Sequence, residues 1–129
     1  FIQSLDFSYG FMTQDKESGT FISKYLLDYL KHKVDIRLTH AIAKHLNASW
    51  LFSYQDRNGT YTSWTVSKYG DEVKYKPLWL VDSRLNWIRN QFTFFVEANN
   101  LLNITYYDYG NVEQPGIWGK AGIVIKLGI

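Results

Sequence analysis

The chain has 129 residues, long enough for one domain, and a net charge of +2 from 14 basic and 12 acidic residues. This near balance, with no long run of lysine or arginine, gives no reason to expect a nucleic-acid partner. The absence of cysteine excludes a disulfide framework and a thiolate metal site. The unusual quantity is the aromatic content, 18% of the residues, in a chain whose mean hydropathy is only −0.26. Apolar and polar residues are therefore interleaved rather than separated into blocks.

Apolar and polar residues alternate along most of the chain, which predicts β-strands. At the N-terminus, Leu5, Phe7, Tyr9 and Phe11 alternate with small polar residues. Helical spacing competes with this pattern only over residues 21–30. Six antiparallel strands are predicted, at residues 1–12, 30–42, 46–55, 78–88, 92–98 and 119–127.

The predicted strands are long, and the connections between them alternate in length. A strand in a soluble protein usually has about five or six residues, whereas a tilted strand that crosses a bilayer needs about 9–11. Long connections at residues 13–28, 56–76 and 99–117 alternate with short ones at residues 43–45 and at Asn90-Gln91. Long loops on one side and tight turns on the other are typical of an up-and-down membrane barrel.

Two tryptophans, Trp79 and Trp87, share one face of a predicted strand. At ~3.3 Å per residue their spacing covers about 26 Å of strand, or roughly 20 Å of height at a tilt of ~40°. That height matches the apolar band of an outer-membrane barrel with a tryptophan at each boundary. Two core tryptophans of a soluble sandwich would give the same pattern.

Charged side chains gather on the opposite face of the predicted strands. If Asn90-Gln91 is a two-residue turn, Arg84 stands opposite Glu97, where an ion pair would contribute ~0.2–1 kcal/mol. In a membrane barrel this face would line a wet lumen, and in a soluble β-protein it would be the solvent face. The residues that we expect to face the lumen are Arg37, Asp82, Arg84, Glu97 and Lys120.

The C-terminal third resembles the last hairpin of the barrel of TonB-dependent outer-membrane receptors. The likeness rests on an Asn-Leu-Leu-Asn motif at residues 100–103, a tyrosine-rich loop, Pro115-Gly116 and a final alternating strand. These features lie in order in the run FFVEANNLLNITYYDYGNVEQPGIWGKAGIVIKL. A weaker likeness to an earlier hairpin of such barrels extends the resemblance to about residues 25–127.

The resemblance implies an all-β fold in which residues 1–129 form the last segment of a transmembrane barrel of 22 strands. The plug domain and the segment that contacts TonB would belong to another part of a longer receptor. Six strands alone would leave two sheet edges unpaired in lipid, where each unpaired backbone group costs several kcal/mol. We therefore expect a fragment of a receptor.

The implied function is energised uptake of a scarce nutrient, such as an iron chelate or a cobalamin-like compound, across the outer membrane of a Gram-negative bacterium. The implied partners are outer-membrane lipid, the rest of the barrel, the plug, TonB and the nutrient. Aromatic residues of the long loops are the candidates for ligand contact, or else for anchoring in the headgroup layer. These residues are Tyr61, Trp64, Tyr69, Tyr106, Tyr107 and Tyr109.

The alternative is a soluble lipocalin-like or fatty-acid-binding β-barrel with an apolar ligand inside. In that case Trp50, Phe52, Phe94 and Ile123 would be buried in a common core. Neither hypothesis includes catalysis, because the sequence has no nucleophile elbow, P-loop or dinucleotide-binding motif. We also expect no cofactor and no metal, because no histidine or acidic residues have the spacing of metal ligands.

Overall fold

The computed structural model describes residues 1–14, 28–65, 68–108 and 112–127, and the side chains of residues 64–69 lie outside this description. Most of residues 21–30, where helical spacing competes, also lie outside it. The described chain is all-β, as predicted, with six long strands in one antiparallel up-and-down sheet. The strands are β1 (Ile2–Phe11), β2 (Leu30–Ala43), β3 (Leu46–Arg57), β6 (Leu78–Arg89), β7 (Phe92–Asn99) and β10 (Trp118–Ile125).

The strands lie in the order β1-β2-β3-β6-β7-β10, so each long strand pairs with the one before it in this series. The predicted turn at Asn90-Gln91 sets the register of β6 and β7, with Arg89 opposite Phe92 and Arg84 opposite Glu97. This register confirms the predicted cross-strand pair. Strands β1 and β10 form the two edges of the sheet.

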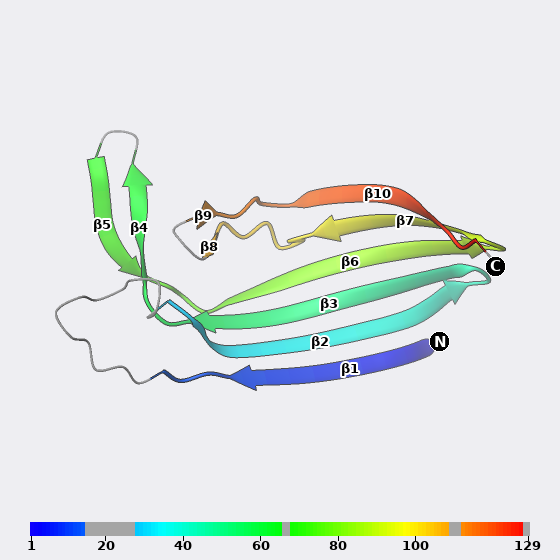
Figure 1. Cartoon of the computed structure of the whole chain (residues 1–129), viewed down its shortest axis with the longest axis horizontal. Coiled ribbons are helices and arrows are strands. Elements are labelled where there is room, and N and C mark those ends of the chain that lie inside the picture. The colour runs from blue at the N-terminus through cyan, green and yellow to red at the C-terminus, as the bar shows by residue number, and fades with distance from the viewer. Residues whose placement is uncertain (15–27, 66–67, 109–111, 128–129) are drawn as a thin grey trace.

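Two short hairpins occupy regions that the sequence predicts only as long connections. One consists of β4 (Thr60–Thr65) and β5 (Lys68–Lys74), and the other of β8 (Tyr107–Asp108) and β9 (Val112–Glu113). Figure 1 shows the β4–β5 hairpin standing away from the sheet. Both hairpins lie at one end of the sheet, and the tight turns at residues 44–45 and 90–91 lie at the other end. The alternation of connection lengths therefore places the loops and the turns at opposite ends.

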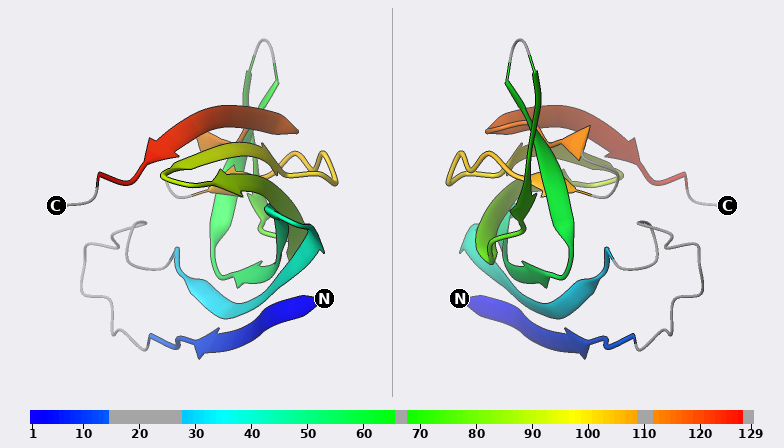
Figure 2. Two further views of the ribbon diagram at one scale, coloured as in Figure 1. Left: turned by 90° about the vertical axis from the view of Figure 1, so that its right-hand side faces the viewer. Right: turned by 90° about the vertical axis from the view of Figure 1, so that its left-hand side faces the viewer.

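The sheet is a single layer that bends into an open trough, as the views along the strands in Figure 2 show. Within the described chain no second layer covers either face, and the buried hydrophobic residues are Ala48 and Leu80 alone. Most of the large apolar side chains lie on the outer face of the trough and are exposed or half-buried, whereas Leu51, Leu80 and Phe95 lie on the inner face. Ile123 is 58% exposed and Val96 57% exposed.

Rows of paired residues cross the outer face of the sheet. One row near the loop end contains Tyr9, Val34, Tyr54 and Trp79, and a row near the turn end contains Leu46, Trp87, Phe94 and Ile123. The rings of Tyr54 and Trp79 are 5.2 Å apart, and those of Trp87 and Phe94 are 5.4 Å apart. Aromatic rings therefore pack together near both ends of the outer face, and Phe7, Phe52 and Trp50 lie between these two rows.

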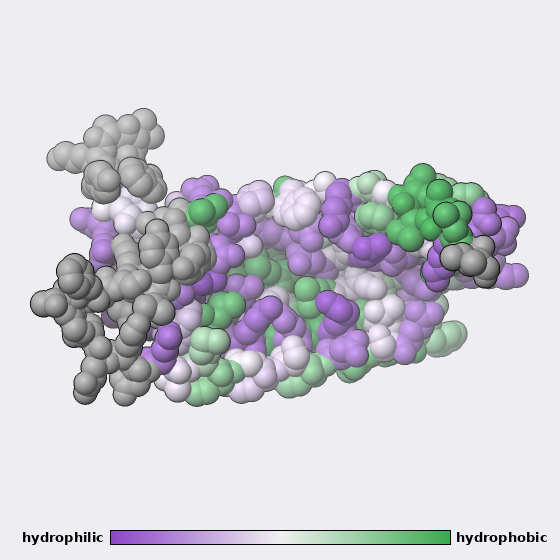
Figure 3. All heavy atoms as spheres, viewed as in Figure 1, coloured by the Kyte–Doolittle hydropathy of each residue, from purple (hydrophilic) through white to green (hydrophobic). Residues whose placement is uncertain are grey.

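The inner face of the trough carries most of the polar side chains. Figure 3 views the molecule from this side, where hydrophilic residues run along the middle of the sheet. Asp35 accepts a hydrogen bond of 2.6 Å from Ser53, and the hydroxyls of Thr39 and Ser49 are 3.1 Å apart. Because side chains alternate between the two faces of a strand, the sequence pattern produces one apolar and one polar face.

The Asn-Leu-Leu-Asn motif fixes the loop that follows β7. Asn100 is buried with a φ of 52°, and its side-chain amide bonds the backbone of Ile104 and the carbonyl of Pro115. Asn103 accepts a hydrogen bond of 2.9 Å from the Ile117 N–H. A Cβ at Gly116 would collide with the Asn103 Oδ1, so a larger residue there would displace the Asn103 side chain. The two asparagines therefore hold the descending and returning arms of the loop together.

Candidate functional site

A cavity of about 530 Å³ lies at the loop end of the sheet. Its walls come from three segments: β4, the stretch that enters β6, and the loop after β7. Aromatic and aliphatic side chains dominate these walls, among them Tyr61, Trp79, Leu102 and Tyr106. A cavity of this size with few polar groups is typical of a small-molecule site.

Stacked tyrosines build one wall of the cavity. The rings of Tyr61 and Tyr107 are stacked with their centroids 4.3 Å apart, and the Tyr75 ring is 5.4 Å from that of Tyr61. The Tyr107 hydroxyl donates a 2.9 Å hydrogen bond to Glu113, which lies directly opposite it in the β8–β9 hairpin. The stacked rings thus join the β4–β5 hairpin to the β8–β9 hairpin.

An ion-pair cluster behind this wall connects the same segments. Arg57, at the end of β3, pairs with Asp28 at 3.3 Å and also with Asp108. The Tyr75 hydroxyl donates a 3.0 Å hydrogen bond to Asp28, and the Arg57 guanidinium lies 5.6 Å from the centre of the Tyr75 ring. Arg57 therefore contacts the segment before β2 through Asp28, the segment before β6 through Tyr75, and the loop after β7 through Asp108.

The environment raises the pKa of three tyrosines of this region, Tyr75, Tyr106 and Tyr107. Burial and the neighbouring Asp28 carboxylate raise the pKa of Tyr75 to about 12. Burial also raises the pKa of Tyr106, and the hydrogen bond to Glu113 raises the pKa of Tyr107. All three hydroxyls are hydrogen-bond donors at neutral pH.

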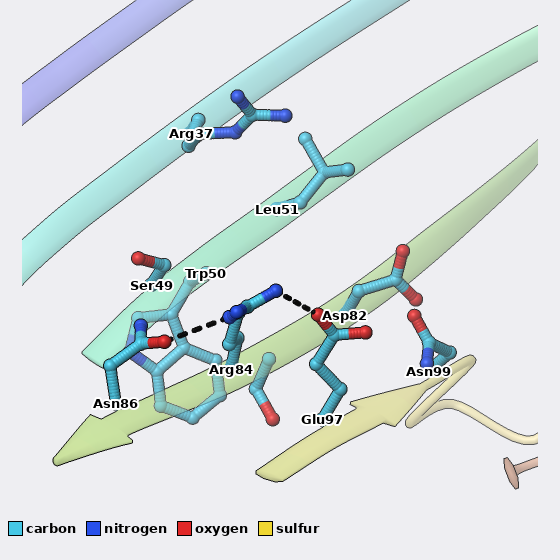
Figure 4. A pocket seen from close by; sticks show the side chains of 10 residues that line it. Arg37, Ser49, Trp50, Leu51, Asp82, Arg84, Asn86, Glu97 and Asn99 are labelled. Carbon is cyan, nitrogen blue, oxygen red and sulfur yellow. Dashed lines mark hydrogen bonds and ion pairs between the residues drawn. The ribbon is translucent and has the colours of Figure 1, made fainter. Parts of the chain in front are cut away.

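A second cavity, of about 440 Å³, lies in the trough on the polar face. Figure 4 shows its lining residues projecting from four neighbouring strands. Glu97 pairs with Arg84 at 2.5 Å and with Lys120 at 2.8 Å, so one carboxylate joins β6, β7 and β10. Asp82 accepts a 2.8 Å hydrogen bond from the Asn100 N–H.

The residues predicted to face a lumen share this face of the sheet. Arg37, Asp82, Arg84 and Glu97 line the second cavity, and Lys120 reaches it through its ion pair with Glu97. The Asn99 Nδ2 is buried at the same cavity without a hydrogen-bond partner among the described residues. No pattern in the sequence indicates that unpaired donor.

Of the residues predicted to contact a ligand, Tyr61, Tyr106 and Tyr107 come together at the loop-end cavity. Trp64 and Tyr69 pair through their backbones in the β4–β5 hairpin, and their side chains lie outside the description. Tyr109 also lies outside the described residues. Sequence reasoning missed Asp28, Arg57, Tyr75 and Asp108, because the contacts that join them span up to 51 residues of sequence and form no local motif.

The described residues contain no cluster of three or more histidine, aspartate or glutamate side chains that could hold a metal ion. None of the described elements is a helix with the length and hydrophobicity of a transmembrane span. Comparisons with protein-family models, curated proteins and solved structures found no match for this chain. Function must therefore be argued from the sheet and its cavities.

Proposed function

We propose that the chain is the C-terminal barrel segment of a TonB-dependent receptor that takes up a scarce nutrient across the outer membrane of a Gram-negative bacterium. The observation that carries the proposal is the division of the sheet into two faces. Large apolar side chains cover the outer face and remain exposed, while ion pairs and hydrogen bonds lie inside the trough. Membrane barrels require this arrangement, with apolar groups toward lipid and polar groups toward the interior.

The strand lengths and the aromatic rows support the same proposal. The six long strands have 8 to 14 residues, which brackets the length that a tilted strand needs to cross a bilayer. The rows that contain Trp79 and Trp87 stand toward opposite ends of the outer face. Tryptophan and tyrosine prefer the two boundaries between hydrocarbon and headgroups.

The two sheet edges indicate that further strands complete the assembly. Strand β1 pairs only with β2 and strand β10 only with β7 in the described chain. In hydrocarbon, each unpaired N–H or C=O on these edges costs several kcal/mol. The proposal therefore assigns other strands of a longer receptor to both edges, and its plug to the trough.

The soluble alternative expects Trp50, Phe52, Phe94 and Ile123 to meet in a dry centre. Phe94 and Ile123 are exposed on the outer face, and no described element covers them. The alternative therefore lacks the apolar core on which it depends.

Membrane fractionation and solubility test the proposal. We expect the receptor that contains this chain to fractionate with outer membranes and to need detergent for extraction. Nutrient accumulation should stop when a protonophore collapses the proton-motive force. A monodisperse monomer of the chain in detergent-free buffer would contradict the membrane assignment, and uptake that persists with the protonophore would contradict energised transport.

Neighbouring residues of β2 provide a matched pair of variants. Leu38 lies on the outer face and Thr39 on the inner face at nearly the same depth. Arginine on the lipid face near the bilayer centre costs about 2–4 kcal/mol. We therefore expect Leu38→Arg to reduce the amount of folded receptor in the outer membrane and Thr39→Arg to leave it almost unchanged.

A further inference from the structure

The loop-end cavity has an uneven chemical lining. Lys76 is the only fully charged side chain among the described residues that line it, and no acidic side chain shares the wall. The remaining surface is largely rings and aliphatic groups, including Tyr61, Trp79, Leu102 and Tyr106. Lys76 forms no ion pair or side-chain hydrogen bond within the described chain. The cavity therefore combines an apolar interior with one unneutralised positive charge.

The hydroxyl groups of the lining tyrosines divide into two sets. Tyr75 donates to Asp28 and Tyr107 donates to Glu113, so these two hydroxyls are engaged. Tyr61 and Tyr106 form no side-chain hydrogen bond with another described residue. Burial keeps the Tyr106 hydroxyl protonated by raising its pKa, so it remains a donor.

We propose that this cavity binds a planar aromatic molecule with an anionic oxygen group, such as an aromatic carboxylate. The ring would lie against Tyr61, Trp79 and Tyr106, and the anionic group would face Lys76. Binding of this ligand class follows from the lining of the cavity. Only a role of the ligand in uptake rests on the proposed receptor function.

The lining argues against other small ligands. A cationic ligand would meet Lys76 without a compensating carboxylate, and a sugar would leave many hydroxyls unpaired against rings and Leu102. A neutral hydrocarbon would fill the volume but would make no use of the ammonium group at the mouth of the cavity or of the Tyr61 and Tyr106 hydroxyls. Flat rings pack well on aromatic side chains, and an ion pair at the mouth of the cavity adds orientation.

Equilibrium dialysis of the receptor that contains this chain, purified in detergent micelles, tests the inference, with protein-free micelles as the blank. The probes are 2-naphthoate, its neutral analogue 2-naphthalenemethanol, and the non-aromatic acid cyclohexanecarboxylate. We expect 2-naphthoate to bind tightest of the three. Lys76→Met should weaken 2-naphthoate about three- to fivefold, the effect of a partly exposed ion pair, and leave the neutral alcohol unchanged.

Lys74→Met is the matched control, because Lys74 is an exposed residue of β5 that does not line the cavity. This variant should bind 2-naphthoate like the unmodified chain. Tyr106→Leu should weaken both naphthalene probes, and circular dichroism should show the same strand content in every variant.

Equal binding of the acid and the alcohol, or equal effects of Lys76→Met and Lys74→Met, would overturn the inference. So would unchanged binding in Tyr106→Leu. These outcomes would not affect the outer-membrane assignment, which depends on fractionation and on the protonophore. Conversely, binding of 2-naphthoate by a protein that does not fractionate with outer membranes would contradict the proposed receptor function and support the proposed binding site.

Discussion

Replacing Arg57 by methionine tests whether the ion-pair cluster holds the loop bases together. The Arg57 side chain is 13% exposed and that of Asp28 is 10% exposed, whereas that of Asp108 is 47% exposed. Removing the cation leaves the Asp28 carboxylate nearly buried, and it retains the hydrogen bond from the Tyr75 hydroxyl. Breaking a buried pair from one side costs ~3–5 kcal/mol, and this retained hydrogen bond reduces the expected loss to about 2–3 kcal/mol.

Asp108, the half-exposed partner of Arg57, provides a comparison for the loss in free energy of unfolding. Asp108→Asn removes a charge that solvent already screens, so we expect a loss of about 0.5 kcal/mol. Both values come from urea titration of the receptor that contains this chain, in detergent, followed by tryptophan fluorescence, with the slope of the transition unchanged. Equal losses for Arg57→Met and Asp108→Asn would refute the reasoning, because burial would then not determine the cost.

Two further predictions concern the same end of the sheet. The pKa of Tyr75 in the folded chain, about 12, lies above the ordinary tyrosine value of 10.0, so its contribution to stability is complete below pH 10 and is lost as pH rises through about 12. Spectroscopic titration at the tyrosinate band should show one late-titrating step that Tyr75→Phe removes; an unchanged curve would contradict this. Gly116→Ala should lower the free energy of unfolding by about 1–2 kcal/mol, because the new Cβ displaces the Asn103 side chain from its hydrogen bond. In the control Gly10→Ala the new Cβ has no atom within 4 Å, so the free energy of unfolding should change by less than ~0.5 kcal/mol. Similar losses in the two variants would contradict the role given to the Asn103 hydrogen bond.

The long strands were predictable because their side chains alternate over many residues. The period of two in β2, β3, β6 and β7, although interrupted at Leu51, Leu80 and Phe95, leaves little freedom in which residues share a face. The turn at Asn90-Gln91 then fixed one register, including the pair Arg84 and Glu97. In Asn90 the positive φ of 51° suits an asparagine, so local chemistry supported the turn.

The two short hairpins were not predictable from the same pattern. The strands β4 and β5 alternate weakly, since polar residues such as Thr60, Thr62 and Glu72 accompany the aromatic ones. Strands β8 and β9 have two residues each, which is too short for a period to be recognised. Their positions depend on contacts between distant segments rather than on local propensity.

The candidate site was predictable only in residue type. Tyrosines in loops indicated a contact surface, and Tyr61, Tyr106 and Tyr107 do line one cavity. The position of Lys76 in that cavity and the cluster around Arg57 follow from how three connections converge at one end of the sheet. No spacing in the sequence encodes that convergence.

The most direct test of the membrane assignment is a spin-label scan along β7 of the receptor that contains this chain, reconstituted in lipid vesicles. The chain has no cysteine, so single-cysteine variants at residues 92–98 carry one label each. The account predicts that labels at positions 92, 94, 96 and 98 collide most with oxygen, which concentrates in lipid. Labels at positions 93, 95 and 97 should collide most with a water-soluble nickel complex. The reverse pattern, or protection of the even positions from both reagents, would contradict the claim that the apolar face meets hydrocarbon.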